Sequence, residues 1–282
     1  MLMRKIKTLH KARYTPIADL VTYNVLPSPS LPQIDPFLFL NHHGPQVYKP
    51  NNNGLPFGPH PHRGMETVTF IIEGDIMHQD SAGHESVIEA GGVQWMTAGR
   101  GLIHAEVSST KFKKEGGPLE ILQLWLNLPA KHKMTAPQYT GLQKNEIPMV
   151  QLADGVEAQC IAGGWQQQKP AFETISDVTI ATLYLKKGSS LSLKVAAERN
   201  IFFYMIRGEV MVNEIKASML HLVEFTNQGE DLVIETLSDS IILFGHAVPF
   251  NEPMVAHGPF VMNTMEEIQQ AYADYQAGKF GN

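Results

Sequence analysis

One strand-turn-strand pattern occurs twice in this sequence, 134 positions apart. Residues 67–77 read TVTFIIEGDIM and residues 201–211 read IFFYMIRGEVM, so a run of β-branched and aromatic residues reaches a glycine at the same place in both copies. Such residues favour strands, and glycine supplies the backbone angles of a tight turn. A chain with this duplication is expected to fold into two similar β units.

Glycine and proline recur along the whole chain and separate short apolar runs. These runs lie about ten residues apart, which is typical of a small sandwich or barrel. Good strand patterns cover residues 20–25, 35–43 and 119–128. Residues 66–80 read as two strands in a hairpin that reverses at Glu73-Gly74-Asp75. The sequence therefore predicts an all-β fold.

A confident helical pattern occurs at the C-terminal end, over residues 264–278. Thr264 and Glu267 have the spacing of a capping box, and Gly278 provides a stop. The apolar stripe at helical spacing consists of Met265, Ile268, Tyr272 and Tyr275. We expect this short helix to cover part of a barrel and to carry no chemistry.

Composition also suggests where the two units meet. The stretch from Pro129 to Met149 is polar and contains the run Lys131-His132-Lys133, which favours an interdomain connection. We therefore predict a first domain over residues 1–130, a connecting segment over 131–148 and a second domain over 149–282.

Four side chains of the metal-ligand type lie in the first half. His60 and His62 flank a proline, and His104 and Glu106 follow about forty residues later. Alternate residues of a strand share a face, so the members of each pair point the same way. If the two strands are neighbours in one barrel, three imidazoles and one carboxylate converge. This set of nitrogen and oxygen donors suits a divalent transition metal such as iron, with positions left open for substrate or oxygen.

The second half lacks these ligands. An offset of 134 places Lys194, Ala196, Ser238 and Ser240 where the three histidines and the glutamate stand in the first half. The second unit is thus expected to keep the strand pattern without the metal.

Charge and composition exclude several classes of protein. The 28 acidic and 22 basic residues give a net charge of −6 with no dense basic run, which argues against a nucleic-acid-binding surface. No window has the roughly 18 apolar residues of a membrane span, and the basic start lacks the apolar core of a signal peptide. Cys160 is the single cysteine, so no internal disulfide or thiolate-rich site can form. A cytoplasmic protein is expected.

Other candidate residues have plainer interpretations. Glu66 has the strand parity of the first histidine pair, but we favour a structural role over a ligand role for it. His42 and His43 are expected to be surface residues at a strand end, with an alternative role at the pocket entrance left open. His78, His84 and His132 are expected to be solvated, whereas His246 and His257 are expected to serve structural hydrogen bonds.

Two long motifs resemble a known family. Residues 60–69 read HPHRGMETVT and residues 94–106 read QWMTAGRGLIHAE; residues 251–253 (NEP) and 257–264 (HGPFVMNT) extend the match to almost the whole chain. The sequence resembles bacterial-type members of the pirin family, in the cupin superfamily. The resemblance implies two tandem cupin β-barrels of the jelly-roll type, a bicupin. It further implies one iron in the first barrel, held by His60, His62, His104 and Glu106, and none in the second.

The resemblance also implies an activity. Similar members cleave flavonols such as quercetin with O2 and release carbon monoxide, so we predict an oxidoreductase of the quercetin 2,3-dioxygenase type. One divalent metal, Fe(II) by preference, would bind the flavonol hydroxyl, and Glu106 would act as catalytic proton acceptor. Imidazole and carboxylate also accept nickel, manganese, cobalt, copper or zinc. The expected partners are a flavonol-like molecule and O2, without nucleic acid or membrane, and the chain is expected to be a monomer.

Two alternatives remain open from the sequence. The chain could be an iron-containing regulatory protein that binds a protein partner according to the oxidation state of the metal. It could also be a structural barrel that takes up metal adventitiously.

Overall fold

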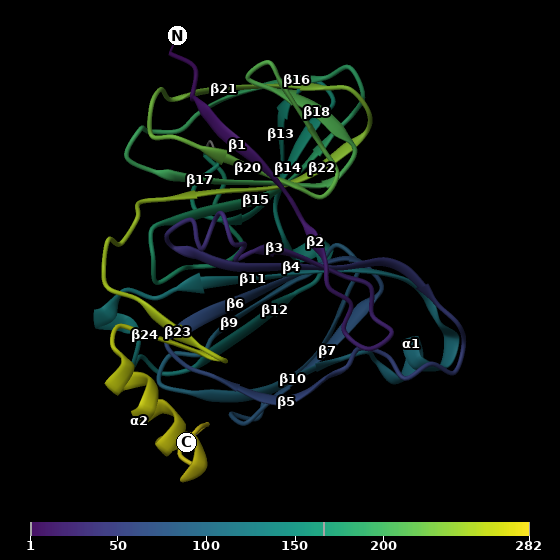
Figure 1. The fold of residues 1–282 in the computed structure, drawn as a ribbon. Coiled ribbons are helices and arrows are strands. Elements are labelled where there is room, and N and C mark those ends of the chain that lie inside the picture. Colours follow the sequence, from purple (N-terminus) through teal and green to yellow (C-terminus); the bar gives the residue numbers. More distant parts are fainter. Residues whose placement is uncertain (1, 166, 282) are drawn as a thin grey trace. The chain divides into compact units, whose positions relative to one another are not determined.

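The computed structural model describes residues 2–165 and 167–281 (Figure 1). In this part of the chain strands dominate, and the helices are α1 (Thr110–Glu115), α2 (Met265–Gln276) and two short 3-10 segments, η1 (Ala130–His132) and η2 (Lys144–Glu146). No helix within these residues is long and apolar enough to cross a membrane. The predicted all-β class is confirmed.

The chain divides into two compact units. Unit 1 contains residues 1–13, 25–36 and 146–249, and unit 2 contains residues 14–24, 37–145 and 250–282. Each unit is therefore assembled from three separate segments, and each is described by itself below.

Unit 2 is built around a seven-stranded and a four-stranded antiparallel sheet. The spatial order of the larger sheet is β12 (Gln138–Leu142), β9 (Val93–Thr97), β6 (Met65–Glu73), β11 (Gly117–Asn127), β4 (Phe37–Tyr48), β3 (Thr22–Leu26) and β2 (Arg13–Tyr14). The smaller sheet has the order β5 (Phe57–His62), β10 (Leu102–Val107), β7 (Asp75–Asp80) and β8 (Glu85–Glu89). A separate pair is formed by β23 (Val255–His257) and β24 (Phe260–Met262).

Unit 1 repeats this arrangement. Its larger sheet has the order β1 (Ile6–Lys11), β20 (His221–Phe225), β17 (Asn200–Arg207), β22 (Ser240–Ala247), β15 (Val178–Leu185), β14 (Val156–Ala162) and β13 (Met149–Ala153). Its smaller sheet has the order β16 (Ser190–Lys194), β21 (Asp231–Thr236), β18 (Glu209–Val212) and β19 (Ile215–Ser218). The central order β9-β6-β11-β4 of unit 2 thus corresponds to β20-β17-β22-β15 of unit 1. The duplication seen in the sequence is a duplication of barrels.

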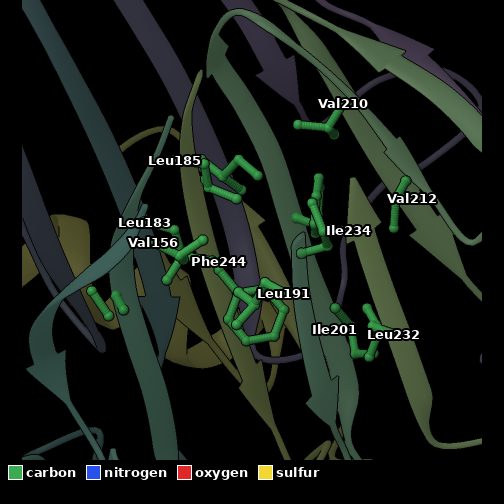
Figure 2. Close-up of a cluster of buried hydrophobic side chains, with 14 of the residues drawn as sticks. Val156, Leu183, Leu185, Leu191, Ile201, Val210, Val212, Leu232, Ile234 and Phe244 are labelled. Carbon is green, nitrogen blue, oxygen red and sulfur yellow. The ribbon is translucent and has the colours of Figure 1, made fainter. Parts of the chain in front are cut away.

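Alternating apolar residues fill the barrel of unit 1. Inward positions of neighbouring strands form one large cluster, which Figure 2 shows in part: Val156, Leu183, Leu185, Leu191, Ile201, Val210, Val212, Leu232, Ile234 and Phe244. Burial of an aliphatic or aromatic side chain of this size contributes about 1.5–3 kcal/mol. The barrel of unit 1 is therefore stabilised by its apolar core.

The prediction of a hairpin over residues 66–80 is wrong, because its two strands do not pair with each other. Gly74 does take the left-handed conformation expected of the turn, with φ of +85°. However, β6 pairs with β9 and β11, whereas β7 pairs with β10 and β8. The turn passes the chain from one sheet to the other instead of pairing its two flanking strands. A local apolar pattern cannot distinguish these outcomes, because both require a strand, a glycine and a strand.

The predicted domain boundaries also differ from the observed units. Strand β1 pairs with β20 of unit 1, while β12, from the segment expected to be a connection, pairs with β9 of unit 2. Helix α2 belongs to unit 2 and packs against β24 and β23. Backbone pairing between distant segments determines these memberships, and composition carries no signal for it.

The C-terminal helix has the predicted caps. Thr264 accepts a hydrogen bond from the backbone N–H of Glu267, whose side chain in turn accepts from the backbone of Thr264, and the reciprocal pair completes the capping box. Beyond the helix, Gly278 has φ of +69°. The buried face packs into a small apolar cluster that contains Phe260, Met262, Ile268, Ala271 and Phe280.

A glycine at the corner between β5 and β6 offers a test of this architecture. Gly64 has φ of +77°, and a Cβ atom there would overlap the carbonyl oxygen of Val261 on β24. Gly83 has a similar φ of +93° but no atom within 4 Å of the Cβ position. We expect Gly64→Ala to lower the free energy of unfolding by about 3 kcal/mol or more, and Gly83→Ala by only about 1 kcal/mol. Urea unfolding measures both, and equal losses would contradict the close approach of β24.

Candidate metal centre

The two strands that carry the predicted ligands lie side by side. Strand β5 pairs with β10 in antiparallel register, and His60 stands directly opposite His104. His62 stands opposite Leu102, two positions along the ladder. The adjacency that the spacing required is therefore present in the structure.

Three imidazoles converge at this place. One ring nitrogen from each of His60, His62 and His104 lies within 4.8 Å of the others, and the Nε2 atoms of His60 and His104 are 3.0 Å apart. His62 and His104 are buried, with exposed fractions of 2% and 1%. Two nitrogen ligands bound about 2.1 Å from one metal at right angles also lie about 3 Å apart. The separation of His60 and His104 thus fits two ligands of one metal ion, and His62 lies beside them.

Hydrogen bonds direct the free nitrogens toward one another. The Nδ1 atoms of His60 and His62 lie 2.8 Å and 3.3 Å from the carbonyl oxygens of Gly58 and Pro259, so both must donate. The Nε2 atoms then carry lone pairs, and that of His62 is buried without a hydrogen-bond partner among the described residues. In metal sites of this kind the second imidazole nitrogen commonly donates to a carbonyl, which fixes the ring.

Burial favours the neutral form of two of these rings, His62 and His104. Desolvation, with the neighbouring His60 as a further cause, lowers the pKa of His62 to about 3. Desolvation and the surrounding histidines also lower the pKa of His104 well below its ordinary value. A neutral imidazole keeps one ring nitrogen with a lone pair that can bind a cation. The donor set therefore fits a divalent transition metal.

Glu106 has a different environment from the three histidines. The ladder between β5 and β10 shifts register between His104 and Glu106, with the additional residue on β5, while β10 stays in regular register with β7. Its buried carboxylate accepts a hydrogen bond of 2.8 Å from Thr69 and close hydrogen bonds from the side-chain amides of Gln94 and Gln123. The structure thus brings three of the four predicted ligands together in one group. The fourth, Glu106, lies on the same strand as His104 and is held in a polar network.

The C-terminal segment supports the strand corner next to these histidines. Arg63 donates to the carbonyl of Arg100 at 2.6 Å, pairs with Asp274 of α2 at 2.8 Å, and lies over the ring of Phe280. The Arg63 and Lys279 side chains, with Gln270, hold the pKa of the Asp274 carboxyl far below its usual range. No local pattern indicates this role of Arg63, because its partner Asp274 lies more than two hundred residues away in the sequence.

Glu66 is a structural residue in this geometry. Its carboxylate accepts hydrogen bonds from Trp95 Nε1 at 3.1 Å and Thr97 Oγ1 at 2.7 Å. Burial raises its pKa. Thr69, three positions along β6, is the side chain that reaches Glu106. The interpretation of Glu66 as structural agrees with these contacts.

The expectation of surface histidines was wrong for three residues. His42 is fully buried against Glu120 at 2.9 Å, and His43 is buried with its Nδ1 2.9 Å from Thr22 Oγ1. His78 stacks on the ring of Tyr139 with centroids 3.8 Å apart. Each of these histidines lies within a paired strand. The apolar periodicity of the sequence did not indicate that these positions are buried.

If the three histidines bind a metal, substitution of one of them should lower the metal content. We expect His62→Ala to reduce the metal content of the purified protein at least tenfold, since it removes a buried ligand. His84→Ala, at a half-exposed histidine outside the cluster, is expected to keep the wild-type content. Elemental analysis with circular dichroism as a folding control measures both. Equal metal in the two variants would contradict the site.

A second prediction concerns acid stability. Desolvation, with His42 as a further cause, lowers the pKa of His43 to about 3. An unfolded histidine binds a proton below about pH 6.5, so between these values the unfolded state holds the additional proton and stability falls as pH falls.

His43 thus contributes about 2 kcal/mol to the loss of stability between pH 6.5 and pH 5. We expect His43→Gln to lose less stability than the wild type over this interval, by about that amount. Urea unfolding of the metal-free proteins at the two pH values measures the difference, and parallel pH profiles would contradict it.

Comparison with known proteins places this geometry in a family. The pirin family model matches residues 19–126, and the model of the pirin C-terminal cupin domain matches residues 180–281. A Pseudomonas aeruginosa protein provisionally named quercetin 2,3-dioxygenase is 36% identical over 94% of this chain and 92% of its own length. A pirin-like protein of Solanum lycopersicum is 39% identical over 90% of this chain and 84% of its own length.

A solved structure extends the comparison to the whole fold. The crystal structure of a quercetin 2,3-dioxygenase from Acinetobacter baumannii shares 34% identity with this chain, with a TM-score of 0.92 over 99% of both chains. The predicted pair of tandem cupin β-barrels with a short C-terminal helix is confirmed. The chain belongs to the pirin family.

Proposed function

We propose that this protein is a metal-dependent dioxygenase that opens the ring of a flavonol-like substrate with O2 and releases carbon monoxide. The observation that carries the proposal is the group of three imidazoles whose ring nitrogens lie within 4.8 Å of one another, two of them with pKa values lowered by burial. The names of the Pseudomonas and Acinetobacter relatives support the same reaction.

In this proposal His60, His62, His104 and Glu106 hold one divalent metal, with Fe(II) as the expected ion. When bound, such an ion lowers the pKa of a coordinated hydroxyl group and leaves positions for substrate and oxygen. The protein's own contribution is to fix the three imidazoles and to place a proton acceptor beside them.

Glu106 is the proposed proton acceptor. Its Oε1 accepts hydrogen bonds from both Thr69 and Gln94, whereas its Oε2 accepts one, from Gln123. Oε2 therefore has more free lone-pair capacity to take the proton of the substrate hydroxyl. A network behind the acid orients it, because Gln94 accepts from Tyr139 at 3.1 Å and Tyr139 is hydrogen-bonded to Ser86 at 2.5 Å.

Aromatic residues stand next to the histidines. Trp125 contacts the ring of His62 edge-on, with centroids 5.2 Å apart, and stacks on Phe39 at 4.4 Å. These rings restrain His62 and offer an apolar surface beside the proposed metal position. Such a surface suits a planar aromatic substrate.

The activity test uses the metal-loaded protein mixed with quercetin without oxygen and then exposed to air. We expect decay of the flavonol absorption band with release of carbon monoxide, and a loss of at least about 100-fold in rate for Glu106→Gln, because the proton acceptor is removed. Glu89→Gln, at an exposed glutamate, is the matched control and is expected to keep the wild-type rate.

Metal content is measured in all three proteins, so that loss of metal is separated from loss of the proton acceptor. A wild-type rate no higher than that of metal-loaded Glu106→Gln would contradict the proposal.

Several sequence predictions stay predictions at this point. They are the cytoplasmic location, the monomeric state, the choice of iron among divalent metals, and the alternative of a redox-dependent regulatory protein. The carbon monoxide readout separates the enzyme from the regulatory alternative, since a sensor has no need to consume a flavonol.

A further inference from the structure

The metal-free barrel of unit 1 contains a cavity at one end of its apolar core. Its volume is about 290 Å³, and its walls include Leu191 of β16 and Phe244 of β22. Figure 2 shows these two side chains beside each other. Trp165, Thr179 and His246 also line it. No residue of this cavity has a role in the activity proposed above.

The cavity lies at the place that corresponds to the metal centre in the other barrel. In unit 2, β6 and β11 align Thr67 with Trp125, the residue that contacts His62. In unit 1, the equivalent strands β17 and β22 align Ile201 with His246. Strand β16, which lines the cavity, is the counterpart of the histidine strand β5. The corresponding end of the two barrels therefore carries different groups, histidines in unit 2 and the walls of this cavity in unit 1.

Two aromatic side chains that line this cavity carry hydrogen-bond donors, His246 and Trp165. His246 Nδ1 accepts a hydrogen bond of 2.7 Å from Arg199 Nε, so the proton of the neutral ring is on Nε2. Burial, followed by the nearby Arg199, lowers the pKa of His246 to about 4, which keeps the ring neutral near pH 7. Trp165 is only 6% exposed, and its indole N–H has no hydrogen-bond partner among the described residues.

Two cationic side chains stand near the cavity, each paired with a carboxylate. Arg199 stands behind His246 and is balanced by Asp177 at 2.7 Å. Lys194 lines the cavity and pairs with Glu230 at 3.2 Å in an exposed position, where screening by solvent weakens the pair. Unlike the converging lone pairs of unit 2, this arrangement offers N–H groups and an ammonium group. It suits a ligand that accepts hydrogen bonds and carries negative charge.

The walls define the rest of the ligand. Trp165 and Phe244 meet edge to face with ring centroids 5.9 Å apart, and Phe244 and His246 do the same. Aromatic edges and aliphatic side chains favour a flat apolar body. A volume of 290 Å³ corresponds to about ten water molecules, which is room for a single substituted ring.

We propose that the metal-free barrel binds a monocyclic aromatic carboxylate, with the ring against Leu191 and Phe244 and the carboxylate on the N–H groups of Trp165 and His246. The proposal is independent of the activity of the metal centre. It gives the barrel of unit 1 a binding role of its own. This barrel would bind a ligand that accepts hydrogen bonds, whereas the barrel of unit 2 suits a cation.

The test follows the tryptophan indole signals of the full, metal-loaded chain in a ¹H–¹⁵N spectrum during titration with benzoate. The chain has three tryptophans, and the Trp165→Phe spectrum identifies the signal of Trp165. We expect a saturable shift of the Trp165 signal, with the Trp125 signal unchanged.

Calorimetry then measures the affinity of protein variants for benzoate and of the wild type for an uncharged analogue. Trp165→Phe keeps an aromatic ring and removes the indole donor, and His246→Gln changes the second donor. Each substitution is expected to lower the affinity for benzoate at least fivefold. Tyr184→Phe on β15, at the opposite strand parity from Thr179, is the control and is expected to bind within twofold of the wild type. Benzamide, which lacks the negative charge, is expected to bind at least fivefold more weakly than benzoate.

Three results would overturn the proposal. The first is no saturable shift of the Trp165 signal up to about 10 mM benzoate, a concentration that detects even weak binding. The second is equal affinity for benzamide and benzoate, or for the wild type and Trp165→Phe. The third is a shift of the Trp125 signal alone that disappears when the metal is removed, since this places benzoate at the metal centre.

Discussion

The antiparallel pairing of β5 with β10 is the constraint on which the candidate metal centre depends. The ladder sets His60 opposite His104 and brings their Nε2 atoms to 3.0 Å. A slip of one residue would move the histidines of one strand to the other face, because side chains alternate along a strand. The fold of the four-stranded sheet and the identity of the metal ligands are therefore linked. His62 joins the group from the same strand, with its ring directed by Pro259.

That pairing is supported by a segment far away in the sequence. Residues 250–282 return to unit 2, where the carbonyls of Pro259 and Val261 accept from His62 and from the buried ammonium of Lys133. Lys133 also donates to Gly64 and Asn127, and burial lowers its pKa to about 8. A buried ammonium requires such a set of acceptors. The C-terminal strand and helix are thus part of the structure that positions the histidines, although they provide no ligand.

The sequence alone predicted the features that depend on local pattern. The duplication at Gly74 and Gly208, the capped helix at Thr264 and the three converging histidines could all be found from residue type and spacing. The pairing of β6 and β7 with different partners could not, since it is decided by strands elsewhere in the chain. The same holds for the register shift before Glu106 and for the burial of His78 against Tyr139. Contacts across long sequence separations leave no periodicity to recognise.

The two barrels also differ in what stabilises them. The barrel of unit 1 has a continuous apolar core, which contributes to stability without a ligand. The barrel of unit 2 places three converging imidazoles beside a carboxylate that accepts three hydrogen bonds. Buried polar groups of this kind cost stability unless they find partners. A metal ion bound to the folded state alone returns part of that stability, about 2.7 kcal/mol at a free concentration of one hundred times its Kd. The duplicated fold therefore does not depend on the candidate ligands, because the corresponding strands of unit 1 form a similar barrel around an apolar core.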